Sequence, residues 1–186
     1  MNSKTIRYRT IVADPPWPYK EGFPQGPARG TGRSTVPLPY AAMSLDEIKA
    51  LPVHELAQKS SWLFLWTTNR YLPYAFPIIG AWGFEYRQTI TWRKTGCPSP
   101  FVTCLAPSQS EYLLIARAGG APRTGCFPST VIDAPAQPRH SAKPDLFLDL
   151  IERAVPGPRL EMFARRQRLG WDTWGNEALE HVQVTA

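Results

Sequence analysis

Short apolar segments that alternate with helix-like segments constrain the fold of this chain more than any other feature. The apolar segments have the length and the β-branched or aromatic content of buried strands. They occupy residues 6–13, 61–66, 84–92 (as one strand or two), 111–116 and 160–163. Strands that alternate with helices favour an α/β fold with a largely parallel sheet. In such a sheet, ligands bind beyond the carboxyl ends of the strands.

The segments between these strands carry recognisable helix signals. Ser44 and Glu47 form a capping box, which predicts a helix that runs to Pro52, where a second short turn starts. Another helix is expected over 73–79, with its end at Gly80 and Gly83. The last expected helix starts at Pro144 and ends at Pro156-Gly157, with an apolar face of Leu146, Phe147, Leu150, Ile151 and Ala154.

The remaining segments are long and rich in proline and glycine. They cover residues 18–43, 93–110 and 119–139, and loops of this length inside a compact domain usually serve a function. The chain has 186 residues, of which 43% are hydrophobic, so a single folded domain over 1–186 is expected. We expect the three long loops to surround a functional site.

The net charge of +6 favours a polyanionic partner, because the excess basic residues lie in the loop segments. Ordinary solubilising charge is the alternative interpretation. No apolar run reaches the roughly 18 residues that span a membrane, and no signal-peptide core is present, so a cytoplasmic protein is expected. The three cysteines are expected to be free thiols, and the scattered histidines predict no metal site.

The sequence Asp14-Pro15-Pro16-Trp17 follows the first predicted strand and precedes Pro18 and Tyr19. A carboxylate at a strand end, two rigid prolines and a large flat ring form a compact clamp for a planar amine. The lone pair of an exocyclic amine on a base is delocalised into the ring. An enzyme must therefore orient and polarise this amine before it reacts. Taken alone, the motif is equally well read as a Pro-rich turn around a buried Trp.

This motif resembles the acceptor-amine motif of S-adenosylmethionine-dependent amino-methyltransferases. Its Trp form is similar to that of the DPPW family, which includes the eukaryotic mRNA adenosine N(6)-methyltransferases and their bacterial and phage relatives. Further matches follow in order over nearly the whole chain: Leu38-Pro39-Tyr40, Met43-Ser44, Phe64-Leu65-Trp66, Trp92-Arg93-Lys94, His140-Ser141-Ala142-Lys143-Pro144 and Gly175-Asn176-Glu177. The ordered set is much more specific than any single match.

The resemblance implies a Rossmann-like class I methyltransferase fold with a permuted motif order, in which the acceptor motif comes first and the cofactor strand late. This order explains why no Gly-x-Gly-x-x-Gly loop is present. It implies that the cofactor strand ends at Phe163, with Arg165 beyond it, and that Asn176 and Glu177 meet the ribose hydroxyls. The other cofactor-binding residues expected are Asp14, His140, Ser141, Lys143 and Arg117, the last of which is alternatively a nucleic-acid contact.

The resemblance also implies roles at the acceptor amine. Asp14 would accept a hydrogen bond from the amine, and the carbonyl of Pro15 would accept the second amine hydrogen. Because methyl transfer from a sulfonium is an in-line displacement, the help of the enzyme is mostly positioning and electrostatics. Trp17, next to Pro16, would stack on the adenine ring. The residues expected to hold the substrate are Tyr19, Lys20, Tyr40, Arg93 and Lys94.

These expectations lead to one main hypothesis, methylation of the N(6) amine of adenine in DNA. DNA is favoured because small stand-alone bacterial and phage relatives are generally assigned to it. The same reaction on RNA is the first alternative, since an unpaired adenine is already accessible there. A catalytically inert nucleic-acid-binding subunit and a small-molecule amine methyltransferase are the others. Whether the chain forms a homodimer or a heterodimer stays open.

Overall fold

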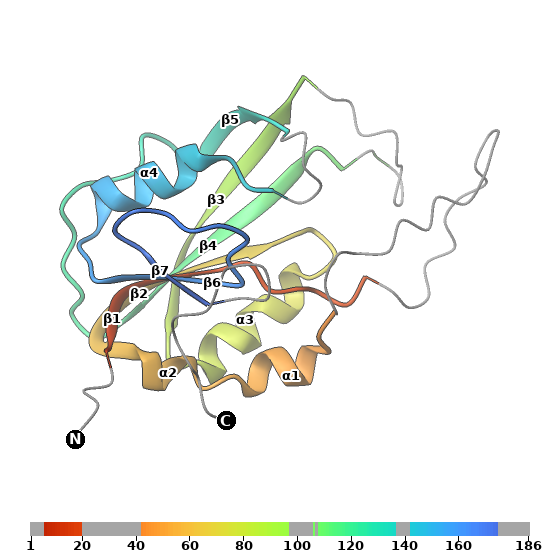
Figure 1. Cartoon of the computed structure of the whole chain (residues 1–186). Helices are drawn as coiled ribbons and strands as arrows, with labels where there is room; N and C mark the ends of the chain where they lie inside the picture. The colour runs from red at the N-terminus through yellow and green to blue at the C-terminus, as the bar shows by residue number, and fades with distance from the viewer. Residues whose placement is uncertain (1–5, 20–41, 97–105, 107, 137–141, 175–186) are drawn as a thin grey trace.

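A seven-stranded mixed sheet forms the centre of the computed structural model, which describes residues 6–19, 42–96, 106, 108–136 and 142–174 (Figure 1). Across the sheet the strands follow the order β5-β3-β4-β2-β1-β6-β7. Their bounds are β1 Tyr8–Ala13, β2 Ala57–Thr67, β3 Glu85–Thr95, β4 Ser110–Ala118, β5 Val131–Pro135, β6 Arg159–Met162 and β7 Asp172–Trp174. The expected α/β, Rossmann-like fold class is confirmed.

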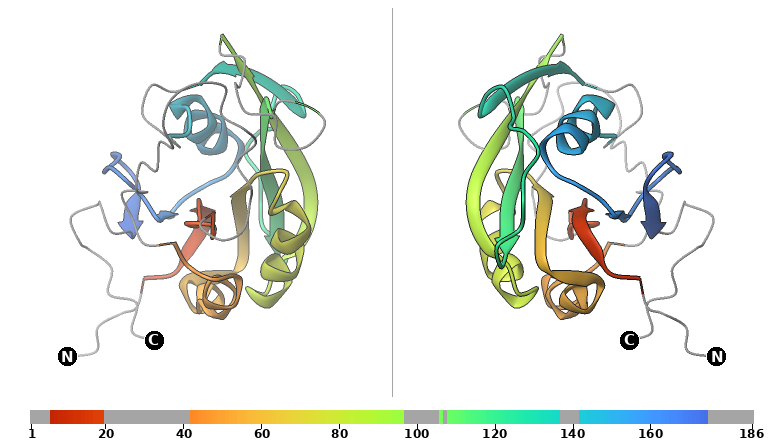
Figure 2. Two further views of the ribbon diagram at one scale, coloured as in Figure 1. Left: turned by 90° about the vertical axis from the view of Figure 1, so that its right-hand side faces the viewer. Right: turned by 90° about the vertical axis from the view of Figure 1, so that its left-hand side faces the viewer.

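Helices cover both faces of this sheet (Figures 1 and 2). One face packs against α1 (Leu45–Ala50), α2 (Val53–Leu56) and α3 (Leu72–Ala81), and the other packs against α4 (Asp145–Ala154). Within β1, Ile11 and Ala13 belong to the core under α1–α3, whereas Val12 belongs to the core under α4. This alternation is the period of two that strand side chains obey. Both faces of the central strands are thus buried.

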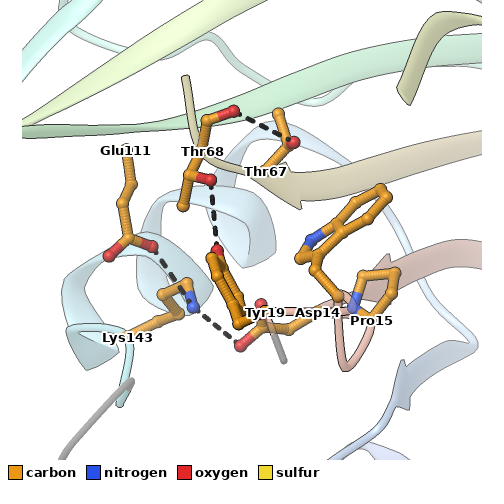
Figure 3. A pocket seen from close by; sticks show the side chains of 8 residues that line it. Asp14, Pro15, Tyr19, Thr67, Thr68, Glu111 and Lys143 are labelled. Carbon is orange, nitrogen blue, oxygen red and sulfur yellow. Dashed lines mark hydrogen bonds and ion pairs between the residues drawn. The ribbon is translucent and has the colours of Figure 1, made fainter. Parts of the chain in front are cut away.

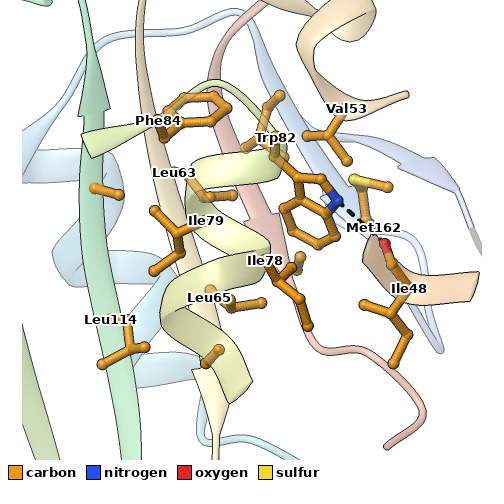
Figure 4. Packing of buried hydrophobic residues seen from close by; sticks show 14 of the residues in the cluster. Ile48, Val53, Leu63, Leu65, Ile78, Ile79, Trp82, Phe84, Leu114 and Met162 are labelled. Carbon is orange, nitrogen blue, oxygen red and sulfur yellow. Dashed lines mark hydrogen bonds between the residues drawn. The ribbon is translucent and has the colours of Figure 1, made fainter. Parts of the chain in front are cut away.

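The core under α1–α3 is closed by an aromatic side chain from the end of α3 (Figure 4). Trp82 is fully buried, and its indole Nε1 donates a hydrogen bond to the carbonyl of Ile48 in α1, at 3.1 Å. A buried indole N–H needs such an acceptor, because an unpaired donor in the core is costly. The bond therefore fixes α1 against α3.

Strand β1 lies between β2 and β6 and runs parallel to both. Val12, for example, is in register with Phe64 of β2 and with Glu161 of β6. The carboxyl ends of these three strands therefore share one edge of the sheet. Strand β4 runs antiparallel to its neighbours β2 and β3, so its first residues reach the same edge. The predicted, largely parallel sheet is confirmed, with β4 as the antiparallel strand.

Most predicted helix boundaries are confirmed. The capping box has both of its bonds: the amide of Glu47 donates to Ser44 Oγ (3.2 Å), and the amide of Ser44 donates to Glu47 Oε2 (2.7 Å). The prediction that Gly80 ends α3 was wrong, since the helix runs on to Ala81. Its end is set by Gly83, whose φ of 83° is the left-handed conformation that glycine adopts without strain.

Two strands and one helix face differ from the expectation. Strand β5 lies inside the stretch 119–139 that was expected to be irregular, and β7 follows the strand that was expected to be last. Both are short strands whose structure depends on pairing with β3 and β6. On α4, Leu146 is exposed and Leu148 is buried in its place. Among the described residues, no helix is long and apolar enough to span a membrane.

Candidate active site

The acceptor motif forms a tight turn directly after β1. The amide of Asp14 donates to the carbonyl of Met162 at the end of β6 (3.5 Å), and the amide of Trp17 donates to the carbonyl of Pro15 (2.8 Å). The carbonyl of Pro16 accepts a hydrogen bond from the amide of Met43, at 3.0 Å. The motif is thus anchored to β6 on one side and to the segment that leads into α1 on the other.

Trp17 is a structural element of this turn. Its side chain is only 3% exposed, it stacks on Tyr71 (centroids 5.2 Å apart, rings 12° from parallel), and its Nε1 donates to the carbonyl of Trp66 (3.2 Å). A ring that is covered to this extent exposes little surface on which a base could stack. This placement is at odds with the expected stacking of Trp17 on adenine. The position of Trp17 agrees with the alternative interpretation of the motif, a Pro-rich turn around a buried Trp.

Tyr19 is the aromatic side chain that the turn leaves accessible. It is 42% exposed, its ring meets Tyr71 edge-on (centroids 5.0 Å apart), and its hydroxyl lies 3.1 Å from Thr68 Oγ1. Burial raises the pKa of Tyr19 to about 12, so the phenol stays protonated at neutral pH. The ring contact with Tyr71 and the hydroxyl contact with Thr68 thus hold the Tyr19 side chain in place.

A pocket of about 340 Å³, partly open to solvent, lies beside this turn (Figure 3). The pocket is located at the shared carboxyl edge of β1 and β2, as the sheet topology predicts for a ligand site. It is lined by Asp14, Pro15, Trp17, Tyr19, Thr67, Thr68, Glu111 and Lys143.

Alternating lysines and carboxylates connect four elements around the pocket. Lys143 Nζ lies 2.7 Å from Asp14 Oδ2 and 3.3 Å from Glu111 Oε2. Lys94 Nζ bonds the other oxygen of Glu111, at 2.5 Å. Glu111 and Lys143 are only 13% and 16% exposed. Water screens such partly buried charges weakly, so each depends on its partners.

The attraction between these charges has a larger effect on the pKa values of Lys143 and Glu111 than burial has. Burial alone would lower the pKa of Lys143, but Asp14 and Glu111 raise it well above its ordinary value. Burial alone would raise the pKa of Glu111, but Lys143 and Lys94 hold it below its ordinary value of 4.5. Both groups are therefore charged at neutral pH. Asp14 is held beside a permanent cation.

Glu111 was missed as a site residue by the sequence analysis, which treated it as the first residue of a buried strand. The signal was present in the strand pattern. Leu113 and Ile115 face the core under α4, and Glu111 continues the same row by the period of two. A carboxylate on an otherwise apolar row suggests a paired or functional charge.

The turn after β6 brings the expected cofactor strand next to the acceptor motif. Phe163 follows β6 with a φ of 63°, and its ring meets Trp174 of β7 at 5.0 Å. The amide of Ala164 donates to the carbonyl of Trp174, which closes the turn (3.1 Å). Because β1 and β6 are parallel neighbours, Phe163 and Asp14 lie at the same edge of the sheet. The half-buried Arg165 belongs to this segment.

Other predicted site residues lie elsewhere. Arg117 is in register with Trp62, in the half of β2 away from the pocket edge, and its guanidinium lies 5.7 Å from the Trp62 ring. The structure thus separates Arg117 from the pocket. Arg93 lies at the exposed end of β3, where it forms a two-bond ion pair with Asp133. The predicted site residues Lys20, Tyr40, His140, Ser141, Asn176 and Glu177 lie outside the described residues.

The fold and this pocket are those expected of an α/β amino-methyltransferase whose acceptor motif lies at the end of a central strand. A family model described as MT-A70 matches residues 8–177, and the chain therefore belongs to the MT-A70 family. The predicted family and enzyme class, an adenine N(6)-methyltransferase, are thereby confirmed. Enzymes of this family in general use S-adenosylmethionine.

Individual relatives are more distant. The chain is 29% identical to the Type II methyltransferase M.MunI of a Mycoplasma species, over 92% of this chain and 78% of that protein. It is 26% identical to the human N(6)-adenosine-methyltransferase catalytic subunit METTL3, over 92% of this chain but 28% of METTL3. It is 29% identical to the N6-methyladenosine RNA methyltransferase MTA1 of Cryphonectria parasitica, over 93% of this chain and 52% of MTA1. The chain thus spans most of M.MunI and a smaller part of the other two.

Replacing Lys143 tests the energetic role of the charges around the pocket. Lys143→Met is expected to lower the free energy of unfolding at pH 7 by about 3 kcal/mol, because it leaves two partly buried carboxylates without their shared cation. Glu111 has a lowered pKa in the folded state, so its contribution is present above pH 4.5 and is lost as the pH falls through that lowered pKa. The loss in the variant should therefore be smaller in acid. Urea denaturation at several pH values measures it.

The matched control is Arg93→Met, which breaks an exposed ion pair with Asp133. Its effect on the free energy of unfolding should be much smaller than that of Lys143→Met, because water screens an exposed ion pair. Equal destabilisation by the two variants would contradict the account of a buried, interdependent charge cluster.

Proposed function

We propose that this chain transfers the methyl group of S-adenosylmethionine to the exocyclic N(6) amine of adenine in DNA. The observation that carries the proposal is the position of Asp14 and Pro15, which line a pocket immediately beside the end of β6. Acceptor and donor sites at one sheet edge are what a direct transfer requires. A single domain over 1–186, with one continuous sheet among the described residues, is part of the proposal.

Asp14 is the group that acts on the amine. A carboxylate has about four acceptor positions, so its bond with Lys143 leaves capacity for an amine hydrogen. The carbonyl of Pro15 accepts one bond from Trp17 and has a second lone pair for the other amine hydrogen. Two acceptors on one side direct the amine lone pair away from them. The negative charge of Asp14 stabilises the positive charge that develops on nitrogen.

Lys143 positions Asp14 through an ion pair. Lys143 was expected to bind the cofactor, and in the structure its ammonium contacts Asp14 and Glu111. The ammonium lies 5.5 Å from the ring of Trp66, which adds a cation–π contact. A cation held from three sides fixes the carboxylate that it binds. Lys94 supports this arrangement through Glu111 and is assigned here to the site rather than to the nucleic-acid backbone.

S-Adenosylmethionine, when bound, supplies an electrophilic methyl group on a sulfonium. We assign Phe163 and Arg165 to its site, together with Asn176, Glu177, His140 and Ser141, which keep the roles that the resemblance gave them. Arg117 is not assigned to the cofactor site, because it lies away from the pocket edge. Lys20, Tyr40 and Arg93 are proposed to hold the substrate. Oε2 of Glu161 in β6 is buried and has no hydrogen-bond partner among the described residues. A buried carboxylate oxygen of this kind favours positive charge nearby, which supports a cationic cofactor.

DNA is proposed as the polymer because of the similarity of this chain to M.MunI. M.MunI, named as a Type II methyltransferase, is matched over 78% of its length by this compact chain. An inert binding subunit is disfavoured, because Asp14, Pro15 and Lys143, to which the proposal gives roles at the amine, all line the pocket.

The direct test is transfer of labelled methyl groups from S-adenosylmethionine to duplex DNA, single-stranded DNA and RNA, each assayed separately. Nucleoside analysis is expected to find N(6)-methyladenine in DNA. Methylcytosine would refute the assignment of the base. Label in RNA alone would reverse the choice of polymer, and nucleic-acid binding without any transfer would favour the inert subunit.

Tyr19 is proposed as the platform on which the target base stacks. Stacking on an aromatic side chain contributes about 1–3 kcal/mol per base. Tyr19→Ala is therefore expected to raise the KM for DNA by about 5- to 150-fold, whereas Tyr19→Phe should keep most of the affinity. Steady-state kinetics with a fixed, saturating cofactor concentration measures both.

Tyr74→Ala is the matched control, because Tyr74 is an exposed tyrosine of α3 that does not line the pocket. It should leave KM unchanged. If Tyr19→Ala behaves like this control while Trp17→Phe raises KM, the base stacks on Trp17 and the platform is wrongly assigned.

A further inference from the structure

Tyr71, the residue directly before α3, contacts three successive residues of the turn after β1. Its ring stacks on Trp17 (centroids 5.2 Å apart, rings 12° from parallel) and meets the ring of Tyr19 edge-on (centroids 5.0 Å apart). Its hydroxyl donates a hydrogen bond to the carbonyl of Pro18, at 2.5 Å. The side chain is only 3% exposed. A single buried residue thus supports the turn from Trp17 through Tyr19.

The hydroxyl bond of Tyr71 constrains the backbone directly before Tyr19. The ring of Pro18 fixes the φ of that residue, so ψ is the one soft backbone dihedral left there. The same ψ orients the carbonyl of Pro18, which the Tyr71 hydroxyl holds. The bond therefore fixes the peptide unit that leads into Tyr19. Burial raises the pKa of Tyr71 above its ordinary value, so the phenol is protonated at neutral pH and can donate.

The connection between β2 and α3 also holds the far end of the Tyr19 side chain. The Tyr19 hydroxyl lies 3.1 Å from Thr68 Oγ1 (Figure 3). The amide of Tyr71 donates to the carbonyl of Thr68, at 3.0 Å. Oδ1 of Asn69 accepts a hydrogen bond from the hydroxyl of Tyr112, at 2.7 Å, which attaches the connection to β4. Both ends of Tyr19 are thus fixed by one short connection that is itself anchored to the sheet.

Tyr71 lies between a covered ring and an accessible one. Trp17 is 3% exposed, whereas Tyr19 is 42% exposed and lines the pocket. Tyr71 is not one of the residues that line the pocket. It can therefore affect a base in the pocket only through the turn that it supports.

We infer that Tyr71 is a positioning residue, which sets the orientation of the Tyr19 ring for the target base. This inference rests on the proposed function, in which Tyr19 is the platform for that base. A ring that is held in place before the base arrives loses less side-chain freedom on binding, so its affinity for the base is higher. Tyr71 then contributes to the binding of nucleic acid although it contacts neither the base nor the cofactor.

Tyr71→Phe tests the inference, because it removes the hydroxyl and keeps the ring next to Trp17 and Tyr19. The KM for DNA is expected to rise about 2- to 10-fold, the factor that corresponds to one hydrogen bond. The value of kcat at saturating DNA should change much less, because Tyr71 has no contact with Asp14 among the hydrogen bonds and ring contacts described. Steady-state kinetics at saturating S-adenosylmethionine measures both constants.

A double variant tests whether Tyr71 acts through Tyr19. Tyr19→Ala removes the platform, so adding Tyr71→Phe to it should raise KM no further. A tyrosine with a merely structural role would raise KM by the same factor in both backgrounds. Tyr86→Phe is the matched control, because it removes the hydroxyl of an exposed tyrosine in β3, which lies 2.9 Å from Thr89 Oγ1. It should leave KM unchanged.

The outcomes separate this inference from the proposed function. A wild-type KM in Tyr71→Phe, or an equal increase in both backgrounds, overturns the inference and leaves the proposed function intact. A wild-type KM in Tyr19→Ala also overturns it, since Tyr71 would then have no platform to position. A wild-type protein that transfers no methyl group to DNA overturns the proposed function itself.

Discussion

The contact of Lys143 with two carboxylates is the interaction on which the site depends. Its Nζ connects Asp14, at the end of β1, with Glu111, at the start of β4, while Lys143 itself leads into α4. Three segments that are far apart in the sequence are thereby fixed around one pocket. Loss of any one of these charges leaves a partly buried partner less well compensated, so the geometry at Asp14 depends on the correct assembly of the sheet.

The sheet order explains why these groups meet. Strand β1 is central and parallel to β2 and β6, so the acceptor motif and the turn at Phe163 share an edge although the first is near the start of the chain and the second near its end. Because β4 runs antiparallel to β2, the first residues of β4 reach that edge, and its last residues lie at the opposite edge. Within this turn, Trp17 holds the backbone in place, and Asp14, Pro15 and Tyr19 line the pocket.

Much of this architecture could be predicted from the sequence, because local signals agree with the tertiary structure. The apolar strands, the capping box at Ser44 and the Asp-Pro-Pro-Trp turn are examples. The differences arise where a distant partner decides. Strand β5 depends on β3, the burial of Trp17 depends on Tyr71, and the distance of Arg117 from the pocket depends on the register of β4. Glu111 continues the apolar row of Leu113 and Ile115, a signal that becomes clear only once the faces of the strands are known.

The central claim is that Asp14 orients and polarises the target amine, and the rate of the chemical step in an Asp14→Asn variant tests it most directly. Single-turnover transfer to adenine in duplex DNA should slow by about 100-fold or more, because the amide keeps the shape but loses the negative charge that stabilises the developing cation. Binding of S-adenosylmethionine should remain measurable in the same protein. A single-turnover rate within a few-fold of the wild type would contradict the account.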